Sequence, residues 1–260
     1  MHILTAPKVT ILSRQSFLGH PDIGWESDSN VGGEALAEFA GRLCYLSFGE
    51  DSGVSAGHKS IPGRTTNEEY LNNILKVKHG SVLEHATWSI LLEGISRSLT
   101  HELVRHRAGF AYSQLSQRYV DESEVGFVVP PEVKEGTKAY DIWVASCERA
   151  LAEYRDLLAE IEEQLSHIKS RTLRRKRARE TARAVLPNCT ETKIVVTGNG
   201  RSWRHLMEMR GSLSADAEIR RMAFAIHDVL VAESDAIFGD IKRLSTPDGT
   251  EYLTTENAKV

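Results

Sequence analysis

Apolar side chains recur at helical spacing most clearly in the middle of the chain. They lie three or four positions apart at Tyr140, Val144, Cys147, Leu151, Tyr154, Leu158, Ile161 and Leu165. This spacing puts them on one stripe of a long helix, while glutamates occupy its other faces. A basic helix follows and ends by Pro187, so the pattern predicts a helical hairpin at about 132–180. Packing against a core or an interface is enough to explain the stripe.

Shorter elements are expected on both sides of the hairpin. The pattern predicts strands at 9–12, 86–93 and 192–197 and a Gly- and Ser-rich loop at 49–63. It also predicts helices at 34–46 and 66–77, and others that begin after capping residues at Ser96, Asn199 and Ser214, with Thr66 capping the helix at 66–77. We therefore expect an α/β (α+β) fold, a small central sheet flanked by helices. The whole chain, 1–260, is expected to form a single domain with the hairpin inserted.

Composition narrows the class of protein. The chain has 260 residues, 41% hydrophobic and 26% charged, with a net charge of -4, which is ordinary for a soluble globular protein. Nothing in that balance indicates a nucleic-acid or membrane partner. The three cysteines, Cys44, Cys147 and Cys189, form no CxxC pair, which argues against a disulfide scaffold or a zinc site. With no signal-peptide pattern and no long apolar run, we expect a cytoplasmic protein.

The densest candidate chemistry lies between Arg105 and Tyr119. Three arginines and a histidine fall within 14 residues, and the intervening segment has no helical pattern. Arginine holds phosphate through two hydrogen bonds and stays charged. Gln114 and Ser116 add groups that hydrogen-bond a base or a sugar. The segment suits a nucleotide, although a solvated polar loop explains it equally well on general grounds.

Two further stretches are candidates for ligand contacts. The first, 79–85, contains two histidines, a glutamate and a glycine; a loop leading into the next strand is a better interpretation of it than a metal site. The second, 199–210, follows a strand and begins a helix, where free amides favour anions. Arg201, Arg204 and Arg210 add positive charge there.

Some functions are excluded by missing motifs. The position four residues after His101 is Arg105, so no zinc-protease motif exists, and neither a Walker loop nor a GxGxxG fingerprint occurs. No metal is expected. The basic run from Lys169 to Arg183 resembles a nucleic-acid surface. Pairing with the acidic helix before it, across the hairpin, is the simpler explanation.

Together these stretches resemble the flavin-dependent thymidylate synthase family. Its signature is the Arg-His-Arg block at 105–107 with a downstream Ser-x-Arg-Tyr at 116–119. The stretches 79–85, 183–187 and 199–210 fall in the family's order, so the resemblance covers roughly 68–230. One departure is that eight residues, 108–115, separate Arg107 from Ser116 where the family usually has seven. The extra residue is expected among Ala108, Gly109 and Phe110, where Gly109 could absorb it as a bulge.

The resemblance implies roles by motif position. Contacts to FAD are implied for Ser81, Arg105, His106, Arg107, Gln114, Asn199, Gly200, Arg201 and His205. Contacts to the nucleotide are implied for Arg97, Glu102, Leu103, Val104, Arg105, Gln114, Leu115, Ser116, Gln117, Arg118, Arg183 and Arg210. Arg210 is the catalytic candidate, as a cation that polarises the uracil ring. Ser116 is expected to bind substrate rather than act as a nucleophile.

The implied reaction is the reductive methylation of deoxyuridine monophosphate. Methylenetetrahydrofolate donates the methylene, NADPH re-reduces the flavin, and the reduced FAD supplies reducing power and relays the one-carbon unit. Homotetramers with active sites shared between subunits are also implied. The alternatives are another FAD-dependent nucleotide-modifying or NADPH-oxidising enzyme on the same scaffold, and a nucleic-acid-binding module that uses Lys169 to Arg183.

Overall fold

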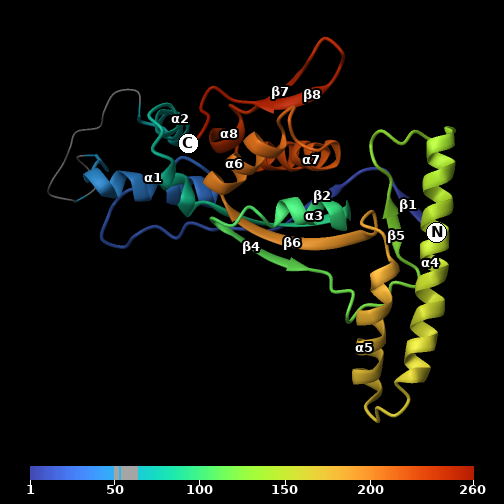
Figure 1. Ribbon diagram of the computed structural model, residues 1–260. Coiled ribbons are helices and arrows are strands. Elements are labelled where there is room, and N and C mark those ends of the chain that lie inside the picture. The colour runs from blue at the N-terminus through green and yellow to red at the C-terminus, as the bar shows by residue number, and fades with distance from the viewer. Residues whose placement is uncertain (50–52, 54–63) are drawn as a thin grey trace. The chain divides into compact units, whose positions relative to one another are not determined.

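Helices and strands are mixed along the chain, in line with the predicted α/β (α+β) class. The computed structural model describes residues 1–49, 53 and 64–260 (Figure 1). A four-stranded sheet has the order β2 (Lys8–Arg14), β3 (Thr87–Ser96), β6 (Glu191–Asn199), β4 (Phe110–Gln114). Two smaller sheets pair β1 (His2–Leu4) with β5 (Gly126–Val128) in parallel, and β7 (Lys242–Ser245) with β8 (Glu251–Thr254) antiparallel. The prediction of small sheets flanked by helices is confirmed.

The chain divides into two compact units. The first comprises Met1–Lys8, Leu92–Arg105 and Ser113–Ile194, and the second comprises Val9–Leu91, His106–Tyr112 and Val195–Val260. The first unit contains α3 (Arg97–Leu103), α4 (Lys138–Gln164), α5 (Arg171–Ala182) and the 3-10 turn η3 (Arg183–Val185). The second contains α1 (Gly32–Tyr45), α2 (Asn67–Lys76), η2 (Gly80–His85), α6 (Gly200–Arg210), α7 (Ala217–Glu233) and α8 (Asp235–Phe238).

Most of the expected helix starts are confirmed by their caps. Thr66 accepts the amide of Glu69, Ser96 that of Leu99, and Asn199 that of Ser202. The cap predicted at Ser214 is wrong. Asp216 caps α7 through the amide of Glu218, while the Ser214 hydroxyl lies against that of Ser212. The loop expected at 49–63 falls almost wholly outside the described residues.

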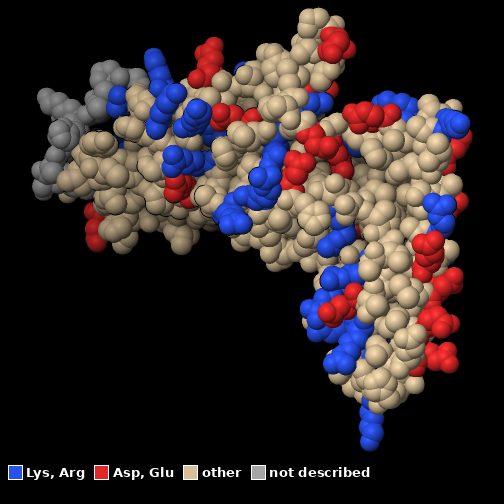
Figure 2. Space-filling model, in the orientation of Figure 1, with Lys and Arg blue, Asp and Glu red and all other residues tan. Residues whose placement is uncertain are grey.

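The predicted hairpin forms, and its seam is apolar. The buried members of the α4 stripe include Tyr154 and Leu158, which pack against Ala178 and Ala182 from the α5 side. No ion pair within 4.0 Å joins the two helices in the fully described hairpin, so the predicted pairing across it is wrong. Because the apolar stripe occupies the seam, acidic side chains line the α4 side and basic ones the α5 side (Figure 2).

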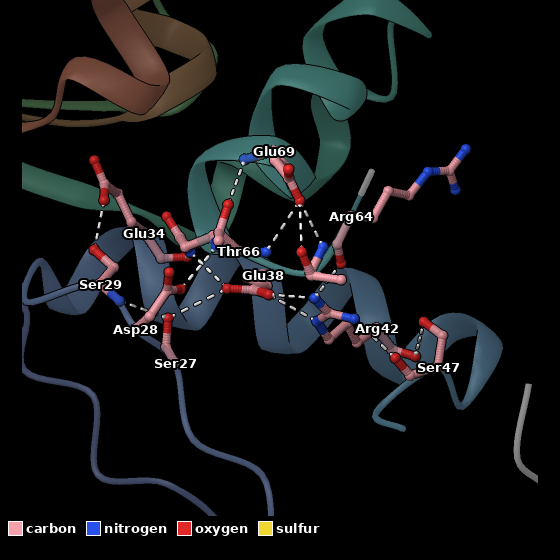
Figure 3. A network of polar contacts seen from close by, with 12 residues as sticks. Ser27, Asp28, Ser29, Glu34, Glu38, Arg42, Ser47, Arg64, Thr66 and Glu69 are labelled. Atoms are coloured by element: carbon pink, nitrogen blue, oxygen red, sulfur yellow. Dashed lines mark hydrogen bonds and ion pairs between the residues drawn. The ribbon is translucent and has the colours of Figure 1, made fainter. Parts of the chain in front are cut away.

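A buried polar network ties the N-terminal segment of the second unit to α1 and α2 (Figure 3). The Glu38 carboxylate, 1% exposed, accepts from Arg42 Nε at 2.7 Å and from Asn67 Nδ2 at 2.7 Å. Arg42 also donates to the carbonyls of Ser47 and Arg64, both at 2.9 Å. The charges are therefore paired and hydrogen-bonded where water is excluded, which is the condition for keeping them buried.

No helix among the described residues is long and apolar enough to cross a membrane.

Candidate functional site

The two predicted sets of site residues fall mainly in different compact units. The nucleotide set lies in the first unit apart from Arg210, and the flavin set lies in the second unit apart from Arg105 and Gln114. No motif or spacing in the sequence indicates this division.

Arg97 is the first residue of α3 and is half-buried. Its backbone amide donates to the carbonyl of Thr190 at 3.0 Å, and its guanidinium Nη1 is buried with no hydrogen-bond partner among the described residues. Burial lowers the pKa of Arg97; Glu122 opposes that shift and the like charge of Arg183 adds to it. The structure thus brings two of the predicted nucleotide-binding arginines within electrostatic reach of each other.

Glu122 is a buried carboxyl that sequence reasoning missed. It is 3% exposed, and its Oε1 has no hydrogen-bond partner among the described residues. Burial raises its pKa to about 7 despite the positive charge of Arg97. It stands in the acidic stretch 121–124, which looks solvated in the sequence, and no local signal distinguishes it.

In the segment 114–118, some polar side chains already have partners within the described part of the protein and one does not. Gln114 Nε2 donates to the hydroxyls of Thr100 and Thr192, both at 3.2 Å. Gln117 is 5% exposed, and its Nε2 has no partner among the described residues. Arg118 pairs with Glu180 at 2.9 Å on the surface. A buried, unsatisfied amide is costly, so Gln117 is a strong candidate for a ligand contact.

The other predicted nucleotide contacts differ in exposure. Leu103 is fully buried, so its side chain belongs to the core. Val104 is 40% exposed and caps the C-terminus of α3, and Arg105 is exposed just beyond it. Glu102, Leu115, Ser116 and Arg183 are half-buried.

In the second unit, the catalytic candidate Arg210 is hydrogen-bonded to His106 of the Arg-His-Arg block. Nε of Arg210, the last residue of α6, donates to Nε2 of His106 at 2.9 Å. The His106 carbonyl accepts from the Tyr112 hydroxyl at 2.6 Å, and burial raises the pKa of Tyr112 to about 12, so that hydroxyl stays a donor. The rings of His106 and His205 lie 5.8 Å apart. The spacing of the sequence did not predict the contact between His106 and Arg210.

The N-terminus of α6 is less open to anions than expected. The Gly200 amide donates to the carbonyl of Ala86 at 2.8 Å, and the Ser202 amide to the Asn199 side chain at 2.8 Å. The prediction of free amides at these two positions is wrong, because the chain uses them internally. Arg201 is exposed and pairs with Glu84 at 2.6 Å.

Gly109 lies in a tight turn just after Arg107, and its role in absorbing the extra residue stays a prediction. Its φ is +72°, in the left-handed region that glycine adopts without strain. A Cβ there would lie 2.1 Å from Ser202 Oγ and 2.6 Å from Asn199 Nδ2. The Ser202 hydroxyl donates to the carbonyl of Ala108 at 2.8 Å, so the turn rests directly on the start of α6.

Within the stretch 79–85, residues 80–85 form η2 rather than the expected loop, and Ser81 is exposed. Among the described residues, no three His, Cys, Asp or Glu side chains gather as a metal site.

Comparison with known proteins shows the family to which this chain belongs. Residues 28–233 match the family model described as "Thymidylate synthase complementing protein". A flavin-dependent thymidylate synthase of Mycobacterium sp. (strain JLS) is 48% identical over 256 residues, 96% of each chain. The chain belongs to the flavin-dependent thymidylate synthase family. A family relative of the same name from Mycobacterium marinum (strain ATCC BAA-535 / M) is 46% identical over 252 residues, again 96% of each chain.

A solved structure shares the fold of this family member. It is the UMP/dUMP methylase PolB from Streptomyces cacaoi bound with 5-Br dUMP, with a TM-score of 0.60 and 18% identity over 92% of this chain and 96% of that one. At that identity the likeness establishes the fold only.

Proposed function

We propose that this protein methylates deoxyuridine monophosphate to thymidylate, using methylenetetrahydrofolate, FAD and NADPH. The family membership gives the reaction class. The observation that carries the proposal is the pair of buried, unpartnered donors in the first unit, Arg97 Nη1 and Gln117 Nε2. A buried guanidinium suits a phosphate, and a buried amide suits the edge of a base or sugar. Arg183, with Arg97, would hold the phosphate.

The donors in the second unit fit a flavin dinucleotide. Arg107 is exposed, and its guanidinium makes no hydrogen bond or ion pair within the described residues, so its charge is available to a diphosphate. Ser81 and His205 are also exposed. When bound, FAD supplies the electrons that turn the transferred methylene into a methyl group, and NADPH restores them.

Arg210 is the proposed catalytic residue. A fixed cation beside the uracil would stabilise negative charge that develops on the ring, as an oxyanion hole does. The bond from its Nε to His106 at 2.9 Å restricts how the guanidinium can rotate. No cysteine lies in a matched motif. Cys147 and Cys189, 3.7 Å apart, belong to an apolar cluster with Phe127 and Leu151.

The assembly and location are further parts of the proposal. Family resemblance supports a homotetramer with active sites shared between subunits, in the cytoplasm.

Release of tritium from C5-tritiated deoxyuridine monophosphate tests the reaction type. Methylation at C5 replaces that hydrogen, so NADPH- and folate-dependent release of tritium is expected. NADPH oxidation without tritium release would indicate instead an NADPH-oxidising flavoprotein on the same scaffold.

A further inference from the structure

Glu122 is buried and Arg97 is half-buried, and each of these oppositely charged side chains has a buried polar atom that makes no hydrogen bond within the part of the chain that the structure describes. Glu122 Oε1 and Arg97 Nη1 each have no hydrogen-bond partner among the described residues. The two side chains nevertheless act on each other electrostatically, each favouring the charged form of the other. A buried charge of this kind is stable only while a compensating charge stays close.

The charged and titratable groups around Glu122 come from several elements. Arg97 on α3 is the cation that acts on it, and Arg183 on η3 acts on Arg97. Glu191 on β6 and Asp121 beside it in the chain both disfavour its ionised form. Tyr154 on α4 accepts the Glu122 backbone amide through its hydroxyl at 3.2 Å, and Arg179 on α5 pairs with Asp121 at 3.2 Å.

This environment makes Glu122 sensitive to a new anion. Two of its neighbours are already acidic, and burial raises its pKa to about 7. A nucleotide phosphate carries a charge of about -1.5 to -2 at pH 7. If Arg97 and Arg183 bind that phosphate, they no longer compensate Glu122, and two anions would share one buried site. Like charges so placed do not both stay ionised.

We propose that Glu122 is the counter-ion of Arg97 in the nucleotide-free protein and takes up a proton when the phosphate of the nucleotide binds. Glu122 is then a positioning residue that couples nucleotide affinity to pH. This inference rests on the proposed function, because it assigns the phosphate to Arg97 and Arg183. The proton comes from solvent and goes to the Glu122 carboxylate, so at most one proton is taken up for each nucleotide bound.

Calorimetric titration of the FAD-loaded protein with deoxyuridine monophosphate tests the proposal. Binding heats measured at about pH 7.5 in buffers of different ionisation enthalpy give the number of protons taken up. The wild type is expected to take up between about 0.5 and one proton per nucleotide, given the pKa of about 7. Glu122→Gln should bind with uptake near zero, whereas the control Glu124→Gln, at an exposed neighbour, should behave as the wild type.

The outcomes separate the two claims. Nucleotide binding without proton uptake in the wild type, or unchanged uptake in Glu122→Gln, overturns the role of Glu122 and leaves the proposed function standing. No nucleotide binding by the wild type contradicts the proposed function itself. A second readout needs no variant: affinity should weaken between about five- and tenfold from pH 7.5 to about 8.5. A constant affinity over that interval overturns the coupling.

Discussion

Arg210 donates from Nε to Nε2 of His106 at 2.9 Å, which joins the end of α6 to the Arg-His-Arg block. Because Arg210 Nε is the donor, His106 Nε2 is the acceptor and carries no proton in this arrangement. The imidazole therefore orients the guanidinium, which keeps its positive charge. The two residues are 104 positions apart in the chain. The contact explains how one cation can be held in a fixed orientation, which electrostatic catalysis requires.

Replacing Arg210 should therefore remove chemistry and leave the cofactor bound. For Arg210→Ala we expect kcat to fall by about 10²–10³, the usual effect of losing one preorganised donor. Flavin content after purification should stay near that of the wild type. Met209→Ala is the matched control, since Met209 is the preceding, 51% exposed residue of the same helix. Near-normal turnover in Arg210→Ala would remove its catalytic assignment.

Arg107 should affect flavin retention more than turnover by the loaded enzyme. Its exposed guanidinium has no partner among the described residues, so Arg107→Ala is expected to cause little change in thermal stability. It should purify with several-fold less FAD, because a diphosphate loses one charged contact. The absorbance of bound flavin per protein measures this. Arg171→Ala, at an exposed arginine of α5, is the control, and equal flavin content in the two variants would argue against the contact.

Gly109 should tolerate a side chain less well than an ordinary left-handed glycine. Gly109→Ala meets both an unfavourable φ of +72° and a clash with Ser202 Oγ. Gly136→Ala has a similar φ of +78° but nothing within 4 Å, so it isolates the backbone cost of roughly 1–2 kcal/mol. Urea unfolding should show a loss of stability in Gly109→Ala at least about 1 kcal/mol larger. Equal losses would mean that the turn yields without disturbing α6.

The ionised carboxylate of Asp240 should stabilise the fold at neutral pH and lose that effect in acid. Burial alone would raise its pKa, but Arg204, Thr255 and Asn257 outweigh that effect and bring the pKa from 3.8 down to about 2. Arg204 Nη2 donates to its Oδ2 at 2.8 Å. The folded-state pKa is depressed, so the ionised form stabilises the fold. Its contribution is complete above about pH 4 and is lost as the pH falls through 2.

The stability difference between wild type and Asp240→Asn should therefore shrink by about 2 kcal/mol between neutral pH and pH 2. Chemical unfolding at several pH values measures it. Asp156→Asn, at an exposed position of α4, should show no such change. A difference that stays constant with pH would contradict the assignment to Asp240.

Local signals predicted much of the fold. The caps at Thr66, Ser96 and Asn199 are side chains that bond an amide three residues on, so their chemistry is visible in the sequence. The buried stripe of α4 is equally local. The cap predicted at Ser214 was wrong because Asp216, two residues later, caps α7 instead. The strands β1 and β5 are three residues each and pair across more than 120 positions, which no local pattern reveals.

The site was only partly predictable, because its energetics depend on contacts between distant segments. Arg97 and Gln117 are recognisable by type, but their buried, unpartnered atoms are a property of packing. Glu122 looks like one more solvated acid in the sequence, yet the fold buries it within electrostatic reach of Arg97. The charge pattern of the hairpin predicted ion pairs between its helices that the fully described hairpin does not contain. Complementary charges suggested pairing, but the apolar seam turns them to opposite sides.

Thymidylate formation by the freshly purified protein tests the proposed function most directly. Its absorbance spectrum is recorded first, and deoxyuridine monophosphate is then supplied with NADPH and methylenetetrahydrofolate, with and without added FAD. We expect a flavin spectrum, or one gained on adding FAD, and thymidylate that depends on all three substrates. A folded protein that holds no flavin after reconstitution and forms no thymidylate would contradict the proposed function.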